Sequence, residues 1–376
     1  MFTAADHNYM HRALELAAFG QYTTHPNPNV GCVIVKEDHI IGEGWHRKAG
    51  EPHAEVHALR AAGEAARGAT VYVTLEPCSH YGRTPPCALA LKEAGVSRVV
   101  CAMQDPNPLV AGRGLHMLAE AGVVVQCGLL HDEAHALNPG FIKRMKSGLP
   151  WVRVKLASSL DGRTALANGQ SQWITGPAAR ADVQRWRARS SAILSGADTV
   201  LMDDPSLNVR WQELPADVQQ TYAEANLRQP LRVIIDSQNR VLPSARLFSL
   251  PGEIVLARHT SVGESLPVSS RELLLPLSRQ GKVDLSALLY ELGGMGCNEL
   301  WVEGGARLAG ALLDGGWVDE LILYMAPKLM GADGKALVDI APLSSMTEVP
   351  RFTLSSLVQI DEDLRMVLTP NKQDER

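Results

Sequence analysis

Two short stretches of the chain carry side chains that can bind a metal ion and move a proton. In EPHAEVHALR, His53 and His57 lie four positions apart with Glu55 between them. In EPCSHYGRTPPC, Cys78 and Cys87 lie nine positions apart. Histidine nitrogen and cysteine sulfur are usual protein ligands of zinc, and glutamate is a common general base. The two stretches therefore predict one zinc site with a proton carrier beside it.

The position of Glu55 separates two kinds of zinc enzyme. A zinc protease helix has glutamate directly after the first histidine, whereas Glu55 comes two positions after His53. Two positions span about 200° around an ideal helix, so His53 and Glu55 can share a site only over a helix end. Pro52 favours the first turn of a helix and places His53 there, while His57 is expected to pack along the helix. His-x-Glu followed by Pro-Cys begins the zinc deaminase signature, although its second cysteine normally follows sooner.

We expect His53, Cys78 and Cys87 to be the zinc ligands, with Cys87 at the start of a helix. Three protein ligands leave one position for water, as in catalytic zinc sites. Zinc would acidify this water, and Glu55 would pass the proton to a ring nitrogen and then to the leaving amine. His80 remains an alternative to Cys87. Spacing alone thus predicts zinc-dependent hydrolysis of an amidine-type group.

The composition limits the class of protein. The 376 residues suggest two or three domains, and 45% hydrophobic with 20% charged residues is typical of a soluble globular chain. A net charge of −5 without a long basic run counts against nucleic-acid binding. No apolar run is long enough to span a membrane, and Asp6, Arg12 and Glu15 interrupt the region where a signal peptide would be apolar. We therefore expect a cytoplasmic protein with reduced cysteines and no membrane partner.

Alternating strand-like and helix-like segments surround the candidate residues. The expected strands of the first half are 31–35, 40–46, 69–77, 98–103 and 123–128, and the expected helices include 53–67 and 88–95. Such alternation predicts an α/β fold with parallel strand pairing. KSGLPW interrupts the pattern with glycine and proline, so the expected domains are 1–147 and 148–376. A second α/β series follows and ends in an antiparallel hairpin over 351–370, while 211–230 shows no clear pattern.

Taken together, the motifs resemble one known family. THPNPNVGCVIV, GEPHAEVHALR, TLEPCSHYGRTPPC and MQDPNPLVAGRG are similar to the deaminase half of the bifunctional riboflavin-biosynthesis deaminase–reductase. KLASSLDGRTAL, SQWITG, DDPSLNVR and VEGGARLAGALL are similar to its reductase half, in the expected order and over nearly the whole chain. The resemblance implies an N-terminal cytidine-deaminase-like α/β/α domain and a C-terminal dihydrofolate-reductase-like α/β domain.

The resemblance also implies the chemistry. The family deaminates 2,5-diamino-6-(ribosylamino)pyrimidin-4(3H)-one 5′-phosphate and then uses NADPH to reduce the ribosyl group of 5-amino-6-(5-phosphoribosylamino)uracil to ribityl. One Zn²⁺ per chain and NADPH are the expected cofactors, and the expected partner is a phosphorylated pyrimidine. Two-domain enzymes often form homo-oligomers, so a dimer or tetramer stays open as an alternative to a monomer. Two alternatives stay open: a nucleic-acid or nucleoside zinc deaminase with an unrelated C-terminal domain, and a non-catalytic zinc module.

The long spacing between the two cysteines fits a phosphorylated substrate. The inserted SHYGRTPP supplies polar and cationic groups, and we expect His80 and Arg83 to contact the phosphate. Asn27 lies in a proline-flanked turn and His46 ends a strand, so both are expected to hold the base or the sugar. Turn stabilisation and surface charge are the competing explanations for all four residues.

The second half lacks the dinucleotide fingerprint Gly-x-Gly-x-x-Gly after a strand. LWVEGGARLAGALL instead combines a strand, two glycines and a helix, so backbone N–H groups at the helix start can bind an anion. The resemblance places NADPH phosphates here, over Gly305, Ala306, Arg307, Leu308, Ala309, Gly310 and Ala311. It implies further cofactor contacts at Ala157, Trp173, Thr199, Asp203 and Ser237.

Substrate contacts in the second half are implied by the resemblance for Ser171, Arg187, Leu207, Arg210 and Glu303. Arg187 and Arg210 could clamp the substrate phosphate in bidentate fashion. Lys155 and Glu303 are candidates for polarising the ring-opened sugar imine as hydride arrives. Taken singly, each of these four charged residues is more often part of a surface ion pair, and it is their shared motif context that favours a binding site.

Overall fold

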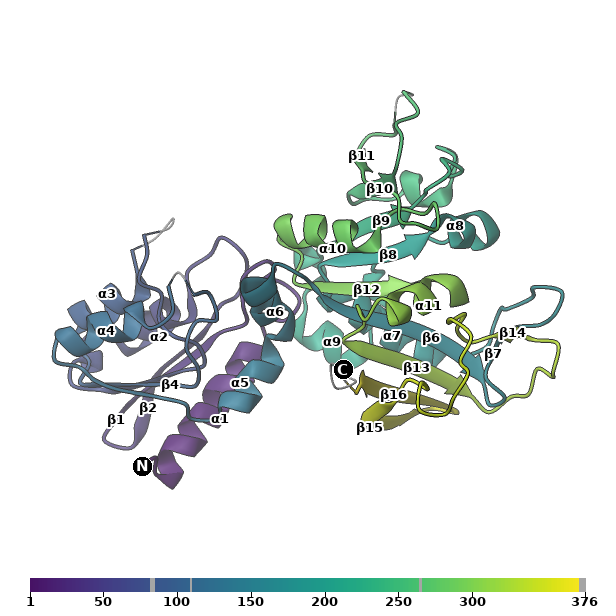
Figure 1. Ribbon diagram of the computed structural model, residues 1–376. Helices are drawn as coiled ribbons and strands as arrows, with labels where there is room; N and C mark the ends of the chain where they lie inside the picture. The colour runs from purple at the N-terminus through teal and green to yellow at the C-terminus, as the bar shows by residue number, and fades with distance from the viewer. Residues whose placement is uncertain (82–84, 109, 264–265, 372–376) are drawn as a thin grey trace. The chain divides into compact units, whose positions relative to one another are not determined.

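The chain forms two compact units, Met1–Leu149 and Pro150–Arg376. Figure 1 shows the computed structural model, which describes residues 1–81, 85–108, 110–263 and 266–371. Each unit is built around its own main sheet, as the alternation of strands and helices predicts. In the part of the chain that the structure describes, no helix is long and apolar enough to cross a membrane.

The first unit contains a five-stranded sheet of order β2-β1-β3-β4-β5. Its strands are β1 (Gly31–Lys36), β2 (His39–Trp45), β3 (Thr70–Val73), β4 (Arg98–Cys101) and β5 (Val124–Cys127). β1 pairs antiparallel with β2 and β3, whereas β3, β4 and β5 run parallel. The strand predicted over 69–77 is shorter than expected, because beyond Val73 the chain leaves the ladder and the Glu76 N–H donates to the Met103 carbonyl oxygen at 3.0 Å.

Helices cover both faces of this sheet. They are α1 (Ala4–Ala18), α2 (Ala54–Ala62), α3 (Cys87–Ala94), α4 (Arg113–Glu120), α5 (His131–Leu137), α6 (Pro139–Ser147) and the 3₁₀ turn η1 (Gly63–Ala66). Alternate residues of β1 point to opposite faces. Cys32 and Ile34 pack with α2, α3 and α4, whereas Val33 and Val35 pack with α1, α5 and α6. The result is the predicted α/β/α sandwich, with α2, α3 and α4 on one side and α1 and α5 on the other (Figure 1).

The second unit contains a nine-stranded sheet of order β11-β10-β9-β8-β12-β6-β13-β16-β15. The strands are β6 (Trp151–Ser159), β8 (Ala192–Gly196), β9 (Leu231–Ile235), β10 (Ile254–Arg258), β11 (Ser270–Leu274), β12 (Glu299–Glu303), β13 (Glu320–Ala326), β15 (Phe352–Ile360) and β16 (Asp363–Pro370). In the order of the sheet, all neighbouring strands from β11 at one edge through β10, β9, β8, β12 and β6 to β13 pair parallel. β16 pairs antiparallel with β13, and β16 and β15 form the expected antiparallel C-terminal hairpin. A separate pair consists of β7 (Arg163–Ala165) and β14 (Lys335–Ala336).

Helices connect the parallel strands of the second unit. They are α7 (Pro177–Arg189), α8 (Ala197–Asp203), α9 (Ala216–Thr221), α10 (Leu285–Gly294), α11 (Ala306–Asp314) and the 3₁₀ turns η2 (Trp211–Glu213), η3 (Glu224–Asn226) and η4 (Arg246–Ser249). The stretch without a clear pattern, 211–230, folds as the short elements η2, α9 and η3. β12 lies between β6 and β8, so β12 and β6 carry their carboxyl ends side by side. Ligands of parallel sheets bind at this edge.

Candidate functional sites

Three ligand atoms meet in the first unit at the spacing that zinc requires. His53 Nδ1 lies 3.6 Å from Cys78 Sγ and 3.4 Å from Cys87 Sγ. The three ligand atoms all lie within 4.8 Å of one another. Tetrahedral zinc, with bonds of about 2.3 Å to sulfur and about 2.0 Å to nitrogen, would separate a nitrogen and a sulfur ligand by about 3.5 Å. The geometry therefore fits one zinc ion and confirms the predicted ligand set.

Two helix starts present these ligands. His53 is the N-cap residue of α2, with extended backbone (φ −73°, ψ 168°), so it precedes the first turn in which it was predicted. Cys87 is the first residue of α3, as predicted, and its backbone N–H donates to Cys78 Sγ at 3.3 Å. Helix N-termini carry partial positive charge and stabilise thiolates. The fold thus favours the ligand form of the cysteines.

Hydrogen bonding among the ligands shifts their proton affinities. Hydrogen bonds from Cys87 and His53 lower the pKa of Cys78 to about 4, although burial acts in the opposite direction. The hydrogen bond with Cys78, together with burial, raises the pKa of Cys87. The hydrogen bond with Cys78 also raises the pKa of His53. Zinc requires both sulfurs as thiolates and histidine as the neutral base, so its binding would release the protons that these groups share.

Glu55 lies beside the ligands without being one of them. It is the second residue of α2 and only 3% exposed, and its Oε2 atom has no hydrogen-bond partner among the described residues. Burial raises the pKa of Glu55 to about 7, and the nearby Cys78 acts in the same direction. A carboxyl group with a pKa near neutrality can both accept and donate a proton. The position and the pKa of Glu55 therefore suit the predicted proton transfer.

Two of the predicted substrate contacts of the first unit lie next to the metal ligands. The His46 ring meets the His53 ring edge-on, with ring centroids 5.4 Å apart. His46 is 2% exposed, and its two nitrogens lie 3.2 Å from the Pro52 carbonyl oxygen and 3.0 Å from Asn27 Nδ2. Because a carbonyl can only accept, Nδ1 carries the ring proton and Nε2 accepts from Asn27. Burial also lowers the pKa of His46, which favours the neutral form of the ring.

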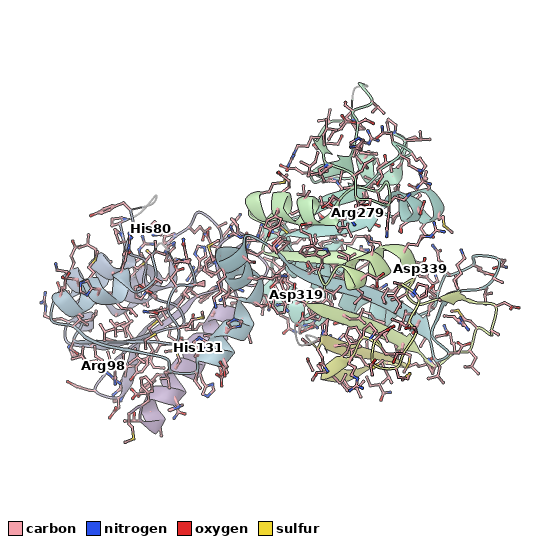
Figure 2. The ribbon with its side chains drawn as sticks, in the orientation of Figure 1. His80, Arg98, His131, Arg279, Asp319 and Asp339 are labelled. Atoms are coloured by element: carbon pink, nitrogen blue, oxygen red, sulfur yellow. The ribbon has the colours of Figure 1, made fainter. Side chains whose placement is uncertain are left out.

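The loop between the two cysteines holds the other two predicted contacts. His80 is exposed near the edge of the first unit (Figure 2), and it does not join the ligand cluster found among the described residues. The cluster that the described residues form contains Cys87 and not His80, which favours Cys87 as the third ligand. Arg83 lies outside the described residues.

The second unit brings three predicted residues together at the carboxyl edge of its sheet. Lys155 of β6 and Glu303 of β12 are direct neighbours in the parallel ladder. Arg187 of α7 holds the Glu303 carboxylate from two sides, with Nε–Oε1 2.6 Å and Nη2–Oε2 2.8 Å. The Trp301 indole N–H also donates to Glu303 Oε1, at 2.7 Å. A charged cluster thus lies inside the fold rather than on the surface.

The charges of this cluster depend on one another. Burial opposes ionisation of Glu303, but the charges of Arg187 and Lys155 overcome it and lower the pKa of Glu303 to about 2. Burial lowers the pKa of Lys155, with Glu303 acting in the opposite direction. Among the described residues, nothing forms a hydrogen bond or ion pair with the Lys155 ammonium. Lys155 is therefore a partly buried amine that has no hydrogen-bond or ion-pair partner of its own among the described residues.

The two arginines predicted to clamp phosphate are both paired with carboxylates. Arg187 binds Glu303, whereas Arg210 binds Glu213 through Nε–Oε1 2.5 Å and Nη2–Oε2 2.6 Å. Asn208 connects them, because its carbonyl oxygen accepts from Arg187 and its side-chain oxygen accepts from Arg210. The side chain of Leu207 is 2% exposed and packs in the core, so a contact of Leu207 with substrate would come from its backbone.

The predicted anion-binding turn forms the start of α11. Gly305 is its N-cap residue, and Gly305 and Arg307 are exposed. Ala309 and Gly310, by contrast, are buried, and a Cβ on Gly310 would lie 1.7 Å from the Asp339 carbonyl oxygen. Gly310 therefore allows the segment around Asp339 to pack on the helix. Phosphate contacts are open to the first turn of α11 but not to its buried face.

The remaining predicted contacts are spread over several elements of the second unit. Trp173 is 64% exposed, and the Arg180 guanidinium lies 4.4 Å from its ring centroid. The Ser237 hydroxyl oxygen accepts from the Val283 N–H at 2.9 Å, which leaves its own proton free to donate. Ala157 lies on β6, Ser171 precedes Trp173, and Thr199 and Asp203 lie on α8.

Comparison with known proteins decides the family. Residues 3–103 match the model for the cytidine and deoxycytidylate deaminase zinc-binding region, and residues 150–366 match the model for the RibD C-terminal domain. The chain is 56% identical over 359 residues to the riboflavin biosynthesis protein RibD of Escherichia coli, covering 96% of this chain and 98% of that protein. The chain belongs to the RibD family.

Solved structures of RibD proteins agree with this assignment. Acinetobacter baumannii RibD, form 1, superposes with a TM-score of 0.90 at 47% identity, covering 98% of this chain and 99% of that one. The deaminase/reductase of Thermotoga maritima superposes with a TM-score of 0.84 at 33% identity, with the same coverage. The chain is thus a bifunctional deaminase and reductase of riboflavin biosynthesis, with the two folds that the motifs predict.

Sequence reasoning missed two acidic residues of the RibD deaminase unit. Asp105 follows β4 and lies close enough to Cys78 and His80 for their charges to act on it, while burial raises its pKa. Glu76 is 6% exposed and comes two residues before Cys78. The quoted motifs contain both, and the signal that could have found Asp105 is its place between a buried strand and a proline. No sequence pattern reveals what Glu76 contacts.

Proposed function

We propose that the first unit hydrolyses the exocyclic amine of 2,5-diamino-6-(ribosylamino)pyrimidin-4(3H)-one 5′-phosphate and that the second unit reduces the ribosyl group of the product with NADPH. The Thermotoga maritima relative is described as a diaminohydroxyphosphoribosylaminopyrimidine deaminase and 5-amino-6-(5-phosphoribosylamino)uracil reductase. The observation that carries the deaminase assignment here is the buried Glu55 carboxyl beside the His53, Cys78 and Cys87 cluster.

In the deaminase unit, Glu55 moves the protons. His53, Cys78 and Cys87 would hold the zinc ion, which would supply the acidity that makes water a nucleophile at neutral pH. Glu55 Oε2, which has no other partner among the described residues, takes the proton of the attacking water. It delivers that proton to the ring nitrogen, and it then carries the second proton, taken from the hydroxyl now bonded to carbon, to the amine, which leaves as ammonia while the C=O bond forms. Asn27 and His46 are proposed to orient the base or the sugar, and His80 and Arg83 to contact the phosphate.

In the reductase unit, Lys155 is proposed to protonate the substrate. NADPH would supply the hydride that reduces C1′ of the ring-opened ribosyl imine. The imine nitrogen needs a proton, and the unpaired Lys155 ammonium can donate one from Nζ. The charge of Glu303 raises the pKa of Lys155 against the effect of burial, and Arg187 in turn keeps Glu303 ionised. Glu303 lies on β12 and Arg187 on α7, so the fold holds both charged side chains in place.

Phosphate and cofactor contacts complete the proposal for the second unit. The Arg210–Glu213 pair is exposed, with side chains 40% and 49% accessible, so Arg210 can exchange its carboxylate for a phosphate at little cost. Arg187 is more buried and committed to Glu303, so it contacts substrate only at the edge of that pair. NADPH is proposed to lie over Ala157, Trp173, Thr199, Asp203, Ser237 and the start of α11, with Ser171 and Leu207 on the substrate.

A coupled assay tests the proposal. Purified protein with zinc, the diaminopyrimidine ribotide and NADPH should release ammonia and then consume NADPH, and NADH should be compared in parallel. Glu55→Gln should lower ammonia release by about 100-fold or more while zinc content stays at one per chain. The same variant should still oxidise NADPH when the deaminated product is supplied. Glu64→Gln, which changes an exposed glutamate of the same unit, is the matched control. Ammonia release that survives Glu55→Gln would refute the proton-transfer role.

A further inference from the structure

Glu76 has a buried carboxylate that the proposed reaction does not use. Its Oε1 atom accepts the Gly114 N–H at 2.9 Å, and its Oε2 atom accepts the Gly112 N–H at 2.8 Å and the Asp105 N–H at 3.1 Å. Gly112 is the N-cap residue of α4 and offers no side chain, so Glu76 satisfies backbone donors that the helix start leaves open. One side chain thereby joins two segments that come later in the chain.

The backbone around Glu76 is packed as closely as its hydrogen bonds suggest. A Cβ on Gly114 would lie 1.9 Å from the Pro77 carbonyl oxygen, so only glycine allows α4 to approach this far. The Glu76 N–H donates to the Met103 carbonyl oxygen at 3.0 Å, directly after β4. We call Glu76, Pro77, Asp105, Gly112 and Gly114 the Glu76 joint.

The Glu76 joint lies between two parts of the deaminase site. On one side, Cys78 follows Pro77 directly and is a zinc ligand. On the other side, Asp105 is fixed through its own N–H to Glu76, and its side-chain Oδ1 accepts the Asn107 N–H at 2.8 Å. The charges of Cys78 and His80 act on the Asp105 carboxyl, which places it in their neighbourhood. A shift of the joint would therefore move Asp105 relative to the metal ligand.

We propose that Glu76 is a positioning residue of the deaminase reaction, whose carboxylate fixes Asp105 and the start of α4 against the turn that presents Cys78. Glu76 itself touches neither zinc nor substrate. The proposal rests on deamination at the zinc site. A displacement of about 1 Å in such a framework can lower catalytic efficiency by about 100-fold.

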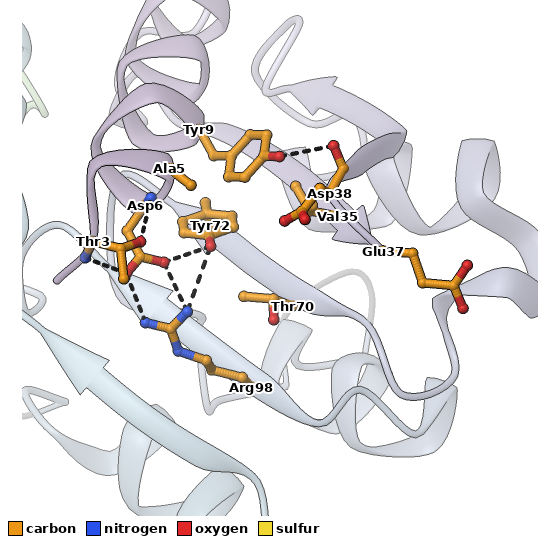
Figure 3. A pocket seen from close by; sticks show the side chains of 10 residues that line it. All are labelled: Thr3, Ala5, Asp6, Tyr9, Val35, Glu37, Asp38, Thr70, Tyr72 and Arg98. Atoms are coloured by element: carbon orange, nitrogen blue, oxygen red, sulfur yellow. Dashed lines mark hydrogen bonds and ion pairs between the residues drawn. The ribbon is translucent and has the colours of Figure 1, made fainter.

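The test compares three single variants of the full chain. Glu76→Gln keeps the shape of the side chain but turns an NH₂ group toward backbone N–H donors. Gly114→Ala disturbs the joint from its other side. Asp6→Asn is the matched control, because Asp6 is also buried (2% exposed) and accepts from Arg98, Tyr72 and Thr3 (Figure 3). His80 and Arg98 mark opposite sides of the first unit in Figure 2, so the control lies away from the site.

The expected result is a loss of efficiency without a loss of metal. Glu76→Gln and Gly114→Ala should each lower kcat/KM for ammonia release by about 10- to 100-fold, with one zinc per chain and unchanged reduction of the deaminated product. Cobalt(II) substituted for zinc should show shifted visible bands in both variants, because Cys78 moves. The double variant should lose no more than about the worse single one, because both changes release the same joint. Asp6→Asn should lower the melting temperature but leave kcat/KM and the cobalt spectrum unchanged.

Two results would overturn the proposal. One is a Glu76→Gln protein with a lower melting temperature but wild-type kcat/KM per zinc and a wild-type cobalt spectrum, which would make Glu76 a support of the fold alone. The second result applies if Glu76→Gln does not fold: a Gly114→Ala protein with wild-type kcat/KM per zinc and a wild-type cobalt spectrum would then overturn the proposal. Failure of the wild-type chain to release ammonia from the ribotide would instead reject the proposed function, while the cobalt spectra would still test the joint.

Discussion

The buried ion pair between Arg187 and Glu303 offers a quantitative test of the second unit. Replacing Glu303 with Gln removes the negative charge but keeps the size of the side chain. Arg187, whose side chain is only 11% exposed, and the partly buried Lys155 would then lie near each other without the Glu303 counter-charge. Breaking a buried pair by removing one partner typically destabilises a protein by about 3–5 kcal/mol.

The pKa of Glu303 gives a second route to the same magnitude. Its pKa is lowered to about 2 from an ordinary value of 4.5. At about 1.4 kcal/mol per unit, this difference corresponds to about 3 kcal/mol of stability at neutral pH. Because the pKa is lower in the folded state, this contribution is complete above pH 4.5 and disappears as the pH falls toward 2. The Glu303→Gln protein should therefore lose less stability than wild type over that range of pH.

Urea unfolding followed by tryptophan fluorescence measures the effect. Six of the seven tryptophans lie in the second unit, and Trp301 contacts Glu303 directly. Glu213→Gln is the matched control, because it breaks an exposed arginine pair in the same unit and should cost less than about 1 kcal/mol. Equal losses in the two variants, or a Glu303→Gln protein with unchanged pH dependence, would show that the pair does not carry the stability assigned to it.

Three further variants test other parts of the chain. Cys87→Ala should abolish zinc binding, measured by metal analysis, while Cys127→Ala, which changes an exposed cysteine, should retain one zinc per chain. Lys155→Met should lower kcat for NADPH oxidation by about 100-fold with little change in NADPH affinity, and an unchanged kcat would exclude proton donation by Lys155. Gly310→Ala should destabilise the second unit in thermal melts by about 1–3 kcal/mol through collision with the Asp339 carbonyl oxygen. A Gly310→Ala protein that is more stable than wild type, as expected when a helix glycine has free space around it, would contradict the close packing of Asp339 on the helix.

The zinc site could be predicted because local rules determine most of it. Proline before His53 and before Cys87 indicated helix starts, and the structure places both ligands at such ends. The offset of Glu55 from His53 excluded the protease arrangement and required the site to lie over the helix end. The one-residue error at His53 reflects the extended backbone of an N-cap, which sequence does not distinguish from the first turn.

The charged cluster of the second unit could not be predicted in the same way. Arg187 and Glu303 are 116 positions apart, and no periodicity records that α7 and β12 meet. The motifs that contain Arg187 and Glu303 indicated a functional site. They did not tell whether Arg187 binds a phosphate or a buried carboxylate, because arginine suits both. Leu207 likewise matched a contact motif while its side chain packs in the core. Long-range packing, which depends on strand order, decides such cases.

The strand order of the second sheet has a consequence for synthesis of the chain. β12, which supplies Glu303, lies between β6 and β8 although both precede it by about a hundred residues or more. As the chain leaves the ribosome, the first unit can close once residue 149 has emerged, but the middle of the second sheet must wait for residue 303. Until then β8 has one unpaired edge and β6 has two, because β13, the other neighbour of β6, comes later still, and unpaired edges invite wrong strand pairing. The nascent protein can thus acquire its deaminase unit well before its reductase unit, and the second half is the part that most needs protection from aggregation during translation.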